Sequence, residues 1–358
     1  MPEIEKIMNI ALDDIEKLMN IGGDDIEKVN DLEYVTEVVW YGDRGLSIGG
    51  YLSGTNQETI EYKAITSTGN MSDFGDIGNY GSYGGIVKLA TGSNKARAVH
   101  MGGYGTNWND DESANAGYLN NIYYLTVAST GDSTDGADLT VARETPVGAT
   151  NGTRQLTYGG WTGSQSDVVD YFTIASISNA SDFGDAYAGT SWMVGSINNS
   201  TRAVFGTGTT AADSTGTARM DYYAIAASPT VSASDFGDLS TAAGERLGQS
   251  GLGGCESATR GIFMGGRDST STTVRDYILY ITVSSTGDAT NFGDLIEAGM
   301  DAGSGATGNA IKGESYGHQT TSANTDTIQS ITIASAGNAA DNGNLSATNA
   351  QNSAISGT

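Results

Sequence analysis

The chain has 358 residues, of which 51 are glycine and 3 are proline, and its 17 Lys plus Arg against 42 Asp plus Glu give a formal net charge of −25. A strongly negative surface repels phosphate backbones and anionic membranes, which argues against nucleic-acid binding. The single cysteine, Cys255, excludes an intrachain disulfide and a cysteine-rich zinc site.

Residues 1–34 carry an eleven-residue repeat, because "IEKIMNIALDD", "IEKLMNIGGDD" and "IEKVNDLEY" start at 4, 15 and 26. This period predicts a right-handed supercoiled helix, whereas Gly22 and Gly23 favour short helical turns capped by Asp13 and Asp24. In either case the segment is too small to bury its own apolar side chains, so we expect it to dock on a partner. It lacks the charge pattern of a signal peptide, and no stretch of the chain is apolar enough for membrane insertion.

Residues 41–358 contain six units of about fifty residues. "SDFGD" occurs at 72–76, 181–185 and 234–238, "TNFGD" occurs at 290–294, and the Phe position is taken by Gly136 and Asn342 in the other two units. Upstream in most units stands a strand that starts at Arg and ends at a glycine pair, such as "RGIFMGG". The sixth unit has a degraded "NAIKGES" there. Alternating stretches such as "YFTIASIS" complete four short strands per unit, which predicts an all-β, six-bladed β-propeller with four-stranded blades.

The sequence divides into an N-terminal repeat segment, 1–34, and a propeller, 35–358. Residues 346–358, "SATNAQNSAISGT", match the small-residue strand that opens the other units. We therefore expect this C-terminal segment to complete the first blade, formed by residues 41–78, because such a splice removes the open edges of a linear array.

The repeated Asp-Phe-Gly is also the metal-binding signature of protein kinases, which use it once, together with a His-Arg-Asp loop. Here it recurs, and neither His100 nor His318 stands in such a triplet. We therefore interpret the motif as architecture: the Phe packs between blades, the Gly permits the turn, and the Asp carboxylates accept backbone N–H bonds or pair with the recurring Arg. Calcium binding by the Asp pairs is the alternative, although two Asp supply fewer ligands than calcium needs.

The glycine pair after an apolar strand resembles the kelch type of propeller over residues 41–358, although the downstream Tyr and Trp pair of that family is missing. More closely, "FTIAS", "DFGDL" and "TRGIFMGG" resemble repeat proteins of tailed bacteriophages, particularly marine ones. That resemblance implies a virion structural protein of the tail, tail fibre or capsid decoration, made in the host cytoplasm without a signal peptide. Phage proteins of this kind open with similar repeats, so the resemblance implies that residues 1–34 contact other virion proteins or form a homo-oligomer.

Candidate binding residues lie in the loops between the second and third strands of the units. These residues are Tyr104, Asn107, Trp108, Asp110 and Trp161. Aromatic faces flanked by amides and carboxylates suit sugar rings, which makes a host-surface glycan a candidate partner. The alternative is that Trp108 fixes its own loop or a neighbouring subunit.

The residues needed for propeller-based catalysis are not evident. Six-bladed propellers resemble sialidases, which use an arginine triad, a Tyr nucleophile and carboxylates, and a kelch-type ring houses a copper oxidase. The recurring Arg residues sit at equivalent places in different blades, as structural residues would, and His and Cys ligands for copper are too few. We predict no catalytic residue, no metal and no cofactor, and a non-enzymatic structural or host-surface-binding module; a polysaccharide-active propeller enzyme is the alternative.

Overall fold

The computed structural model describes residues 41–78, 85–106, 116–191, 195–206, 208–210, 217–239, 251–266, 274–299 and 305–357, together with the backbone of four short strands before residue 34. The chain divides into two compact units, Met1–Val38 and Val39–Thr358. In these described parts, no helix has the length and apolar character needed to cross a membrane.

The described part of the first unit consists of two small hairpins. β1 (Lys6–Ile7) pairs with β2 (Ile10–Ala11), and β3 (Lys28–Val29) pairs with β4 (Leu32–Glu33). The hairpins start 22 residues apart, which is twice the eleven-residue period. The prediction of helical structure is therefore wrong for these residues. An isolated helix of about one repeat is marginal in water, and the Asn and Asp of the repeats favour turns.

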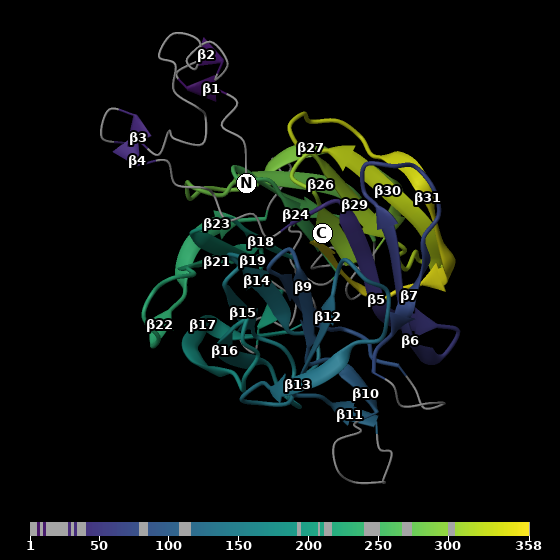
Figure 1. Cartoon of the computed structure of the whole chain (residues 1–358), viewed down its shortest axis with the longest axis horizontal. Coiled ribbons are helices and arrows are strands. Elements are labelled where there is room, and N and C mark those ends of the chain that lie inside the picture. The colour runs from purple at the N-terminus through teal and green to yellow at the C-terminus, as the bar shows by residue number, and fades with distance from the viewer. Residues whose placement is uncertain are drawn as a thin grey trace. The chain divides into compact units, whose positions relative to one another are not determined.

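The second unit is a six-bladed β-propeller whose blades are four-stranded antiparallel sheets (Figure 1), as the sequence predicted. The innermost strands of blades one to six are β32 (Ser353–Gly357), β8 (Ala90–Ser93), β14 (Val147–Thr150), β18 (Ser196–Asn198), β24 (Gly253–Glu256) and β28 (Gly305–Gly308). The second strands are β5 (Arg44–Leu52), β9 (Arg97–Met101), β15 (Arg154–Tyr158), β19 (Arg202–Gly206), β25 (Arg260–Met264) and β29 (Lys312–Tyr316).

The third strands are β6 (Thr55–Ala64), β12 (Asn121–Thr126), β16 (Ser166–Thr173), β21 (Arg219–Ala224), β26 (Arg275–Thr282) and β30 (Thr325–Thr332). The outer strands are β7 (Ser72–Asp76), β13 (Thr134–Asp138), β17 (Ser181–Ser191), β23 (Ser234–Asp238), β27 (Thr290–Gly299) and β31 (Ala340–Asn349). The third blade also carries β20 (Thr209–Thr210) and β22 (Val231–Ser232), and the second carries a hairpin of β10 (Tyr104–Thr106) and β11 (Ala116–Tyr118).

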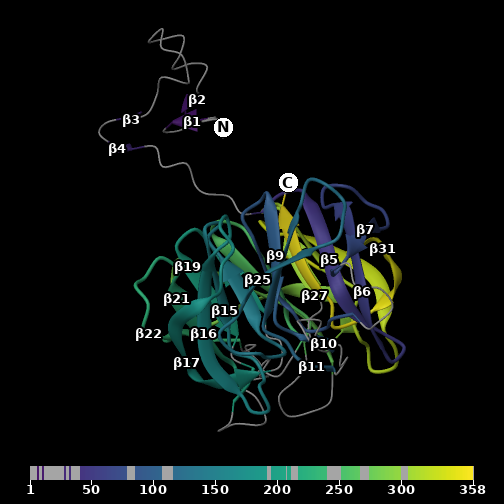
Figure 2. The same cartoon turned by 60° about the horizontal axis from the view of Figure 1, so that its bottom comes forward.

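The ring closes through the C-terminal strand. Inner strands contact one another in the cyclic order β8, β14, β18, β24, β28 and β32, and β32 contacts β8. β32 pairs antiparallel with β5, from Ser353 opposite Ile48 to Gly357 opposite Arg44, and the purple β5 and β7 lie beside the yellow β31 in both views (Figures 1 and 2). The closing strand is shorter than the expected segment 346–358, because β31 of the sixth blade extends to Asn349.

Each interface between neighbouring blades holds a hydrophobic cluster, and the Phe of the repeated motif is part of it in the four blades that have this Phe. Phe74 packs in one cluster with Leu125 of the next blade, and Phe292 packs in another with Ile331 of the next blade. The interpretation of this Phe as an inter-blade residue is confirmed. Burial of one such Phe side chain between sheets stabilises the fold by about 2 kcal/mol, because its apolar surface is removed from water.

The repeated motif also links adjacent blades through the backbone. Between blades four and five, the Phe236 carbonyl accepts the Gly287 N–H at 2.7 Å, and the Asp288 carboxylate accepts the Asp238 N–H at 2.9 Å. Asp235, the first Asp of the motif, accepts the N–H of the motif's own glycine at 3.1 Å. The first Asp of the motif therefore accepts a backbone N–H bond, one of the two roles expected for the motif's carboxylates.

In most blades a glycine pair stands at the end of the second strand, and the third blade shows why glycine is required there. Gly159 and Gly160 have φ values of 60° and 112°, a region that favours glycine. A Cβ on Gly160 would lie 2.8 Å from the Glu144 carbonyl oxygen, so the neighbouring loop also requires the absence of a side chain.

His100 provides a pH-sensitive point in the core. Its ring is fully buried and stacks on Tyr123 with centroids 5.2 Å apart, and neither ring nitrogen has a hydrogen-bond partner among the described residues. Burial lowers the pKa of His100 to about 3. The unfolded chain binds a proton on this residue near pH 6.5, whereas the folded chain does so only near pH 3. His100 therefore contributes stability above pH 6.5 that is lost as the pH falls.

We expect His100→Phe to make the propeller less sensitive to mild acid. Phe is the residue at the equivalent positions Phe205 and Phe263, so the replacement suits the site. Between pH 7 and pH 5 the histidine should account for a loss of about 2 kcal/mol, at about 1.4 kcal/mol per pH unit. Urea unfolding of both proteins at the two pH values measures this loss, and an equal loss in the variant would contradict the assignment.

Candidate functional site

The inner strands leave little space along the axis of the ring. They are built from small residues because neighbouring strands approach closely: a Cβ on Gly148 would lie 2.1 Å from the Thr91 carbonyl oxygen, and one on Gly254 would lie 2.2 Å from that of Ser196. The two cavities between these strands have volumes of about 80 and 60 Å³. Ligand pockets usually measure 300 Å³ or more, so the part of the axis lined by the described inner strands does not hold a substrate-sized site.

The recurring Arg residues join neighbouring blades. The Arg154 Cζ lies 4.8 Å from the centroid of the Tyr171 ring and 5.8 Å from that of Phe183. Its Nη1 donates to the carbonyl oxygens of Ile225 and Ala227 in the next blade, at 2.9 and 2.7 Å. The same arrangement recurs at Arg44, Arg97, Arg202 and Arg260. Each of these guanidinium groups therefore binds carbonyl oxygens and aromatic faces, and they do not pair with the motif's carboxylates.

A buried carboxylate on a third strand has a similar role. Asp170 in β16 accepts the Thr140 N–H at 3.2 Å and the Thr140 hydroxyl at 2.6 Å, where the outer strand of the preceding blade ends. Arg143 donates to the same carboxylate at 2.9 Å, and both side chains are fully buried. These contacts fix the loop that enters the third blade. Removal of either charged partner would destabilise the fold, since the other charge would stay buried without compensation.

Tyr158 and Asp221 form a second buried pair between blades three and four. The Tyr158 hydroxyl donates to Asp221 Oδ2 at 2.9 Å, and Arg219 Nε lies 2.7 Å from Asp221 Oδ1. Burial and the neighbouring Asp221 carboxylate raise the pKa of Tyr158 well above its usual value. A tyrosine nucleophile must lose its proton easily, so Tyr158 suits the role of a structural donor.

The structure brings together two of the predicted binding residues. Tyr104 in β10 lies edge-on to Tyr118 in β11, with centroids 6.1 Å apart, and Trp161 Nε1 donates to the Tyr118 hydroxyl at 2.9 Å. β10 and β11 lie near the lower edge of the propeller in Figure 2. Tyr118, which was not among the predicted residues, links the aromatic residues of two blades. The other predicted residues, Asn107, Trp108 and Asp110, lie outside the described residues.

The strongest candidate site lies at the interface between the sixth and first blades. At the preceding interface, Ile262, Phe292 and Ile331 pack in one apolar cluster. The residues at the equivalent positions of the closing interface are Glu314, Asn342 and Lys63. Two further exchanges accompany them, because Lys312 stands in place of Arg260 and Ser330 in place of Tyr280.

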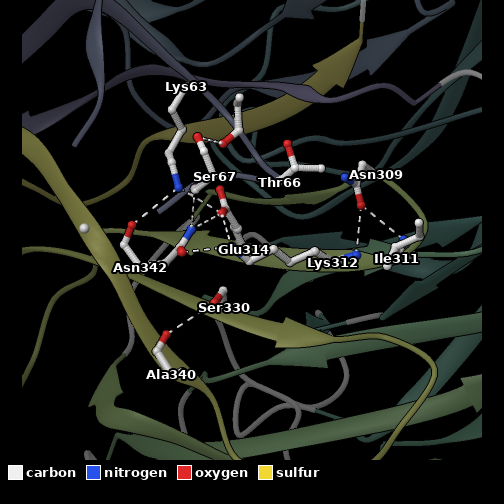
Figure 3. A network of polar contacts seen from close by, with 12 residues as sticks. Lys63, Thr66, Ser67, Asn309, Ile311, Lys312, Glu314, Ser330, Ala340 and Asn342 are labelled. Carbon is white, nitrogen blue, oxygen red and sulfur yellow. Dashed lines mark hydrogen bonds and ion pairs between the residues drawn. The ribbon is translucent and has the colours of Figure 1, made fainter. Parts of the chain in front are cut away.

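Lys63, Lys312, Glu314 and Asn342 form one network of polar contacts (Figure 3). Lys63 Nζ lies 3.0 Å from Glu314 Oε1, the Tyr316 hydroxyl donates to Glu314 Oε2 at 3.0 Å, and Asn342 Nδ2 donates to Glu314 Oε1. Lys312 Nζ donates to Asn342 Oδ1 at 2.8 Å and lies 3.4 Å from Glu314 Oε1. The Lys63 and Glu314 side chains are buried, whereas Lys312 is 21 % exposed, so the network reaches the surface at Lys312.

The buried pair is electrostatically costly. Burial raises the pKa of Glu314, and the Lys63 ammonium opposes that rise. Burial likewise lowers the pKa of Lys63, and Glu314 opposes that change. Each charge therefore depends on the other, since a lone charge in this position would lose its hydration without compensation.

A pocket of about 370 Å³ adjoins the network. Its walls include Thr66, Ile311, Lys312, Ser330 and Asn338. At the equivalent positions of blade five, Arg260 stacks on Tyr280, with its Cζ 4.7 Å from the centroid of the ring. The smaller Ser330 in place of that tyrosine leaves the space open.

The sequence contained a signal for this pocket. Unit six departs from the repeat at the Arg, Tyr and Phe positions, in Lys312, Ser330 and Asn342. In the sequence alone, these departures look like degradation of the repeat. They are instead neighbours in space, together with Lys63 of the first blade.

Comparison with solved structures finds the same fold elsewhere. The solved structure described as "Structure of YjhT" is similar with a TM-score of 0.56 and 11% sequence identity, over 81% of this chain and 95% of that one. At this identity the likeness shows the β-propeller fold alone. No family model matches the chain, and no curated protein matches it.

Proposed function

We propose that this chain is a non-enzymatic virion structural protein of a tailed phage, whose propeller serves as an interaction and host-surface-binding module. One observation carries the non-enzymatic part of the proposal. Groups that could perform chemistry, such as the recurring Arg154 and the buried Asp170, form bonds between blades. The narrow axis of the ring favours the same proposal over the polysaccharide-active alternative.

The virion role rests on the resemblance of the propeller repeats, and of the eleven-residue repeats in the N-terminal segment, to those of phage proteins. The proposal assigns residues 1–34 to contacts with other virion proteins or with further copies of the chain. The recurrence of a hairpin at two places in this segment, β1–β2 and β3–β4, is consistent with a repeated attachment element. Candidate contacts with host glycans remain at Tyr104 and Trp161.

Light scattering tests the assembly part of the proposal. We expect the full chain, whose monomer mass is 36.9 kDa, to form a defined oligomer and a shortened chain that begins at Val35 to be a folded monomer. Circular dichroism of the shortened chain provides the control that the propeller has folded. If the full chain and the shortened chain are both monomeric, residues 1–34 do not form homo-oligomers. Glycan-hydrolysis assays would then be the next experiment.

A further inference from the structure

The interface beside the Lys312 pocket departs from the residue pattern of the preceding blade interface. At the preceding interface the equivalent positions bury Ile262, Phe292 and Ile331 together, and Arg260 stacks on Tyr280. A buried ion pair is seldom more stabilising than a well-packed apolar cluster of similar volume. Coordinated departures of this kind from a protein's own scaffold pattern are expected at functional sites.

The charges around the pocket balance. Lys63 and Lys312 carry positive charge, and Glu314 lies within 3.0 and 3.4 Å of them. The second carboxylate is that of Asp43, which accepts hydrogen bonds from the Thr66 N–H at 2.9 Å and the Thr66 hydroxyl at 2.7 Å. Two cations and two anions leave no net charge to attract an ionic ligand.

The pocket offers both donors and acceptors. Lys312 has three N–H donors, and its contacts with Asn342 and Glu314 use two of them, so one remains for a ligand. The hydroxyl oxygens of Thr66 and Ser330 can accept, because each has lone pairs left after donating its proton. Ile311, which is 70% exposed, adds an apolar surface at the rim.

We propose that this pocket binds the ring of a neutral sugar. A sugar hydroxyl both donates and accepts, which matches the mixed character of the walls, and the C–H face of the ring matches Ile311. The volume of about 370 Å³ lies within the range of small-molecule sites. The inference deepens the proposed function, on which it rests, by naming the ligand class and a site other than the loop that contains Tyr104.

Ligand-observed NMR on the full chain tests the proposal with glucose, galactose and mannose as probes and glucuronate as the anionic comparison. We expect at least one neutral hexose to bind with a millimolar Kd. Ser330→Tyr restores the residue found at Tyr280 and should fill the pocket, weakening binding at least tenfold. Lys312→Met keeps the chain length of the side chain without its donors and should weaken binding at least fivefold. The matched control is Ile296→Ser, an exposed position on β27, which should bind like the natural protein.

Each other outcome overturns the assignment. If no neutral hexose binds the natural protein, the sugar pocket is wrong, while the assembly role of residues 1–34 is judged separately by light scattering. If a hexose binds the Ser330→Tyr and Lys312→Met variants as tightly as the natural protein, a binding function stands but its site is elsewhere. Binding of glucuronate alone would contradict the charge balance on which the choice of a neutral ligand depends.

Discussion

Gly237→Ala is expected to reduce the free energy of unfolding by about 4 kcal/mol, whereas Gly287→Ala should reduce it by about 1 to 2 kcal/mol. Both glycines have a positive φ, 140° and 155°, so both substitutions strain the backbone. Only Gly237 faces a neighbour: a Cβ there would lie 2.4 Å from the Gly287 carbonyl oxygen and 2.5 Å from its carbon, whereas nothing lies within 4 Å of a Cβ on Gly287. The difference between the variants therefore isolates the close approach of the two blades.

Urea unfolding of the two variants and the natural protein measures this difference. The Gly287 N–H donates to the Phe236 carbonyl beside this close contact. A shift of the backbone that made room for the Cβ would therefore weaken the hydrogen bond between blades four and five. If both variants lose the same stability, backbone strain alone explains the glycine in the repeated motif. The glycine of the motif would then carry no information about how blades pack.

The propeller could be predicted from the sequence because its features repeat. The Phe, the glycine pair and the Arg recur in most units, about fifty residues apart, and each recurrence reflects the same physical requirement. Phe74 and Phe292, for example, occupy equivalent inter-blade clusters. The partner of the recurring Arg could not be predicted from residue types, because it is a backbone carbonyl oxygen, such as that of Ile225, and every residue has one.

The N-terminal segment shows where periodicity misleads. The sequence has an eleven-residue period, but this spacing is compatible with short hairpins as well as with a helix. A period identifies a repeated unit and not the conformation inside it. The choice between the two depends on local turn chemistry and on packing that a single repeat does not reveal.

The candidate site could not be recognised from the sixth unit by itself. Lys63 and Glu314 are 251 residues apart, and they meet only because the ring closes between the last blade and the first. Equivalent positions in the repeat identify the pair, because Lys63 corresponds to Ile331 and Glu314 to Ile262. Departures from a repeat are informative when they are compared across the interface that they share.

Lys63→Met is expected to cost about 3 kcal/mol at pH 7, because it leaves the buried Glu314 carboxylate without its closest cation. Glu314→Gln should likewise destabilise, by leaving the Lys63 ammonium unpaired. The double variant Lys63→Met with Glu314→Gln should return to within about 1 kcal/mol of the natural protein, since Gln keeps an oxygen that can accept from Tyr316. Urea unfolding of the four proteins forms a double-mutant cycle, and the sum of the two single losses should exceed the loss in the double variant by at least about 3 kcal/mol.

The pH dependence of the Lys63→Met variant provides an independent check on the cause. Burial already raises the pKa of Glu314, and without Lys63 it should rise further. A carboxyl group whose pKa is higher in the folded than in the unfolded chain stabilises the fold most at a pH below its unfolded pKa. The loss of stability in the variant should therefore shrink as the pH falls from 7 towards 4.5. Additive single losses or a deficit that does not change with pH would mean that the network is ordinary packing. Coupling with the expected pH dependence would mean that the closing interface carries a costly charge pair that the other interfaces replace with apolar side chains.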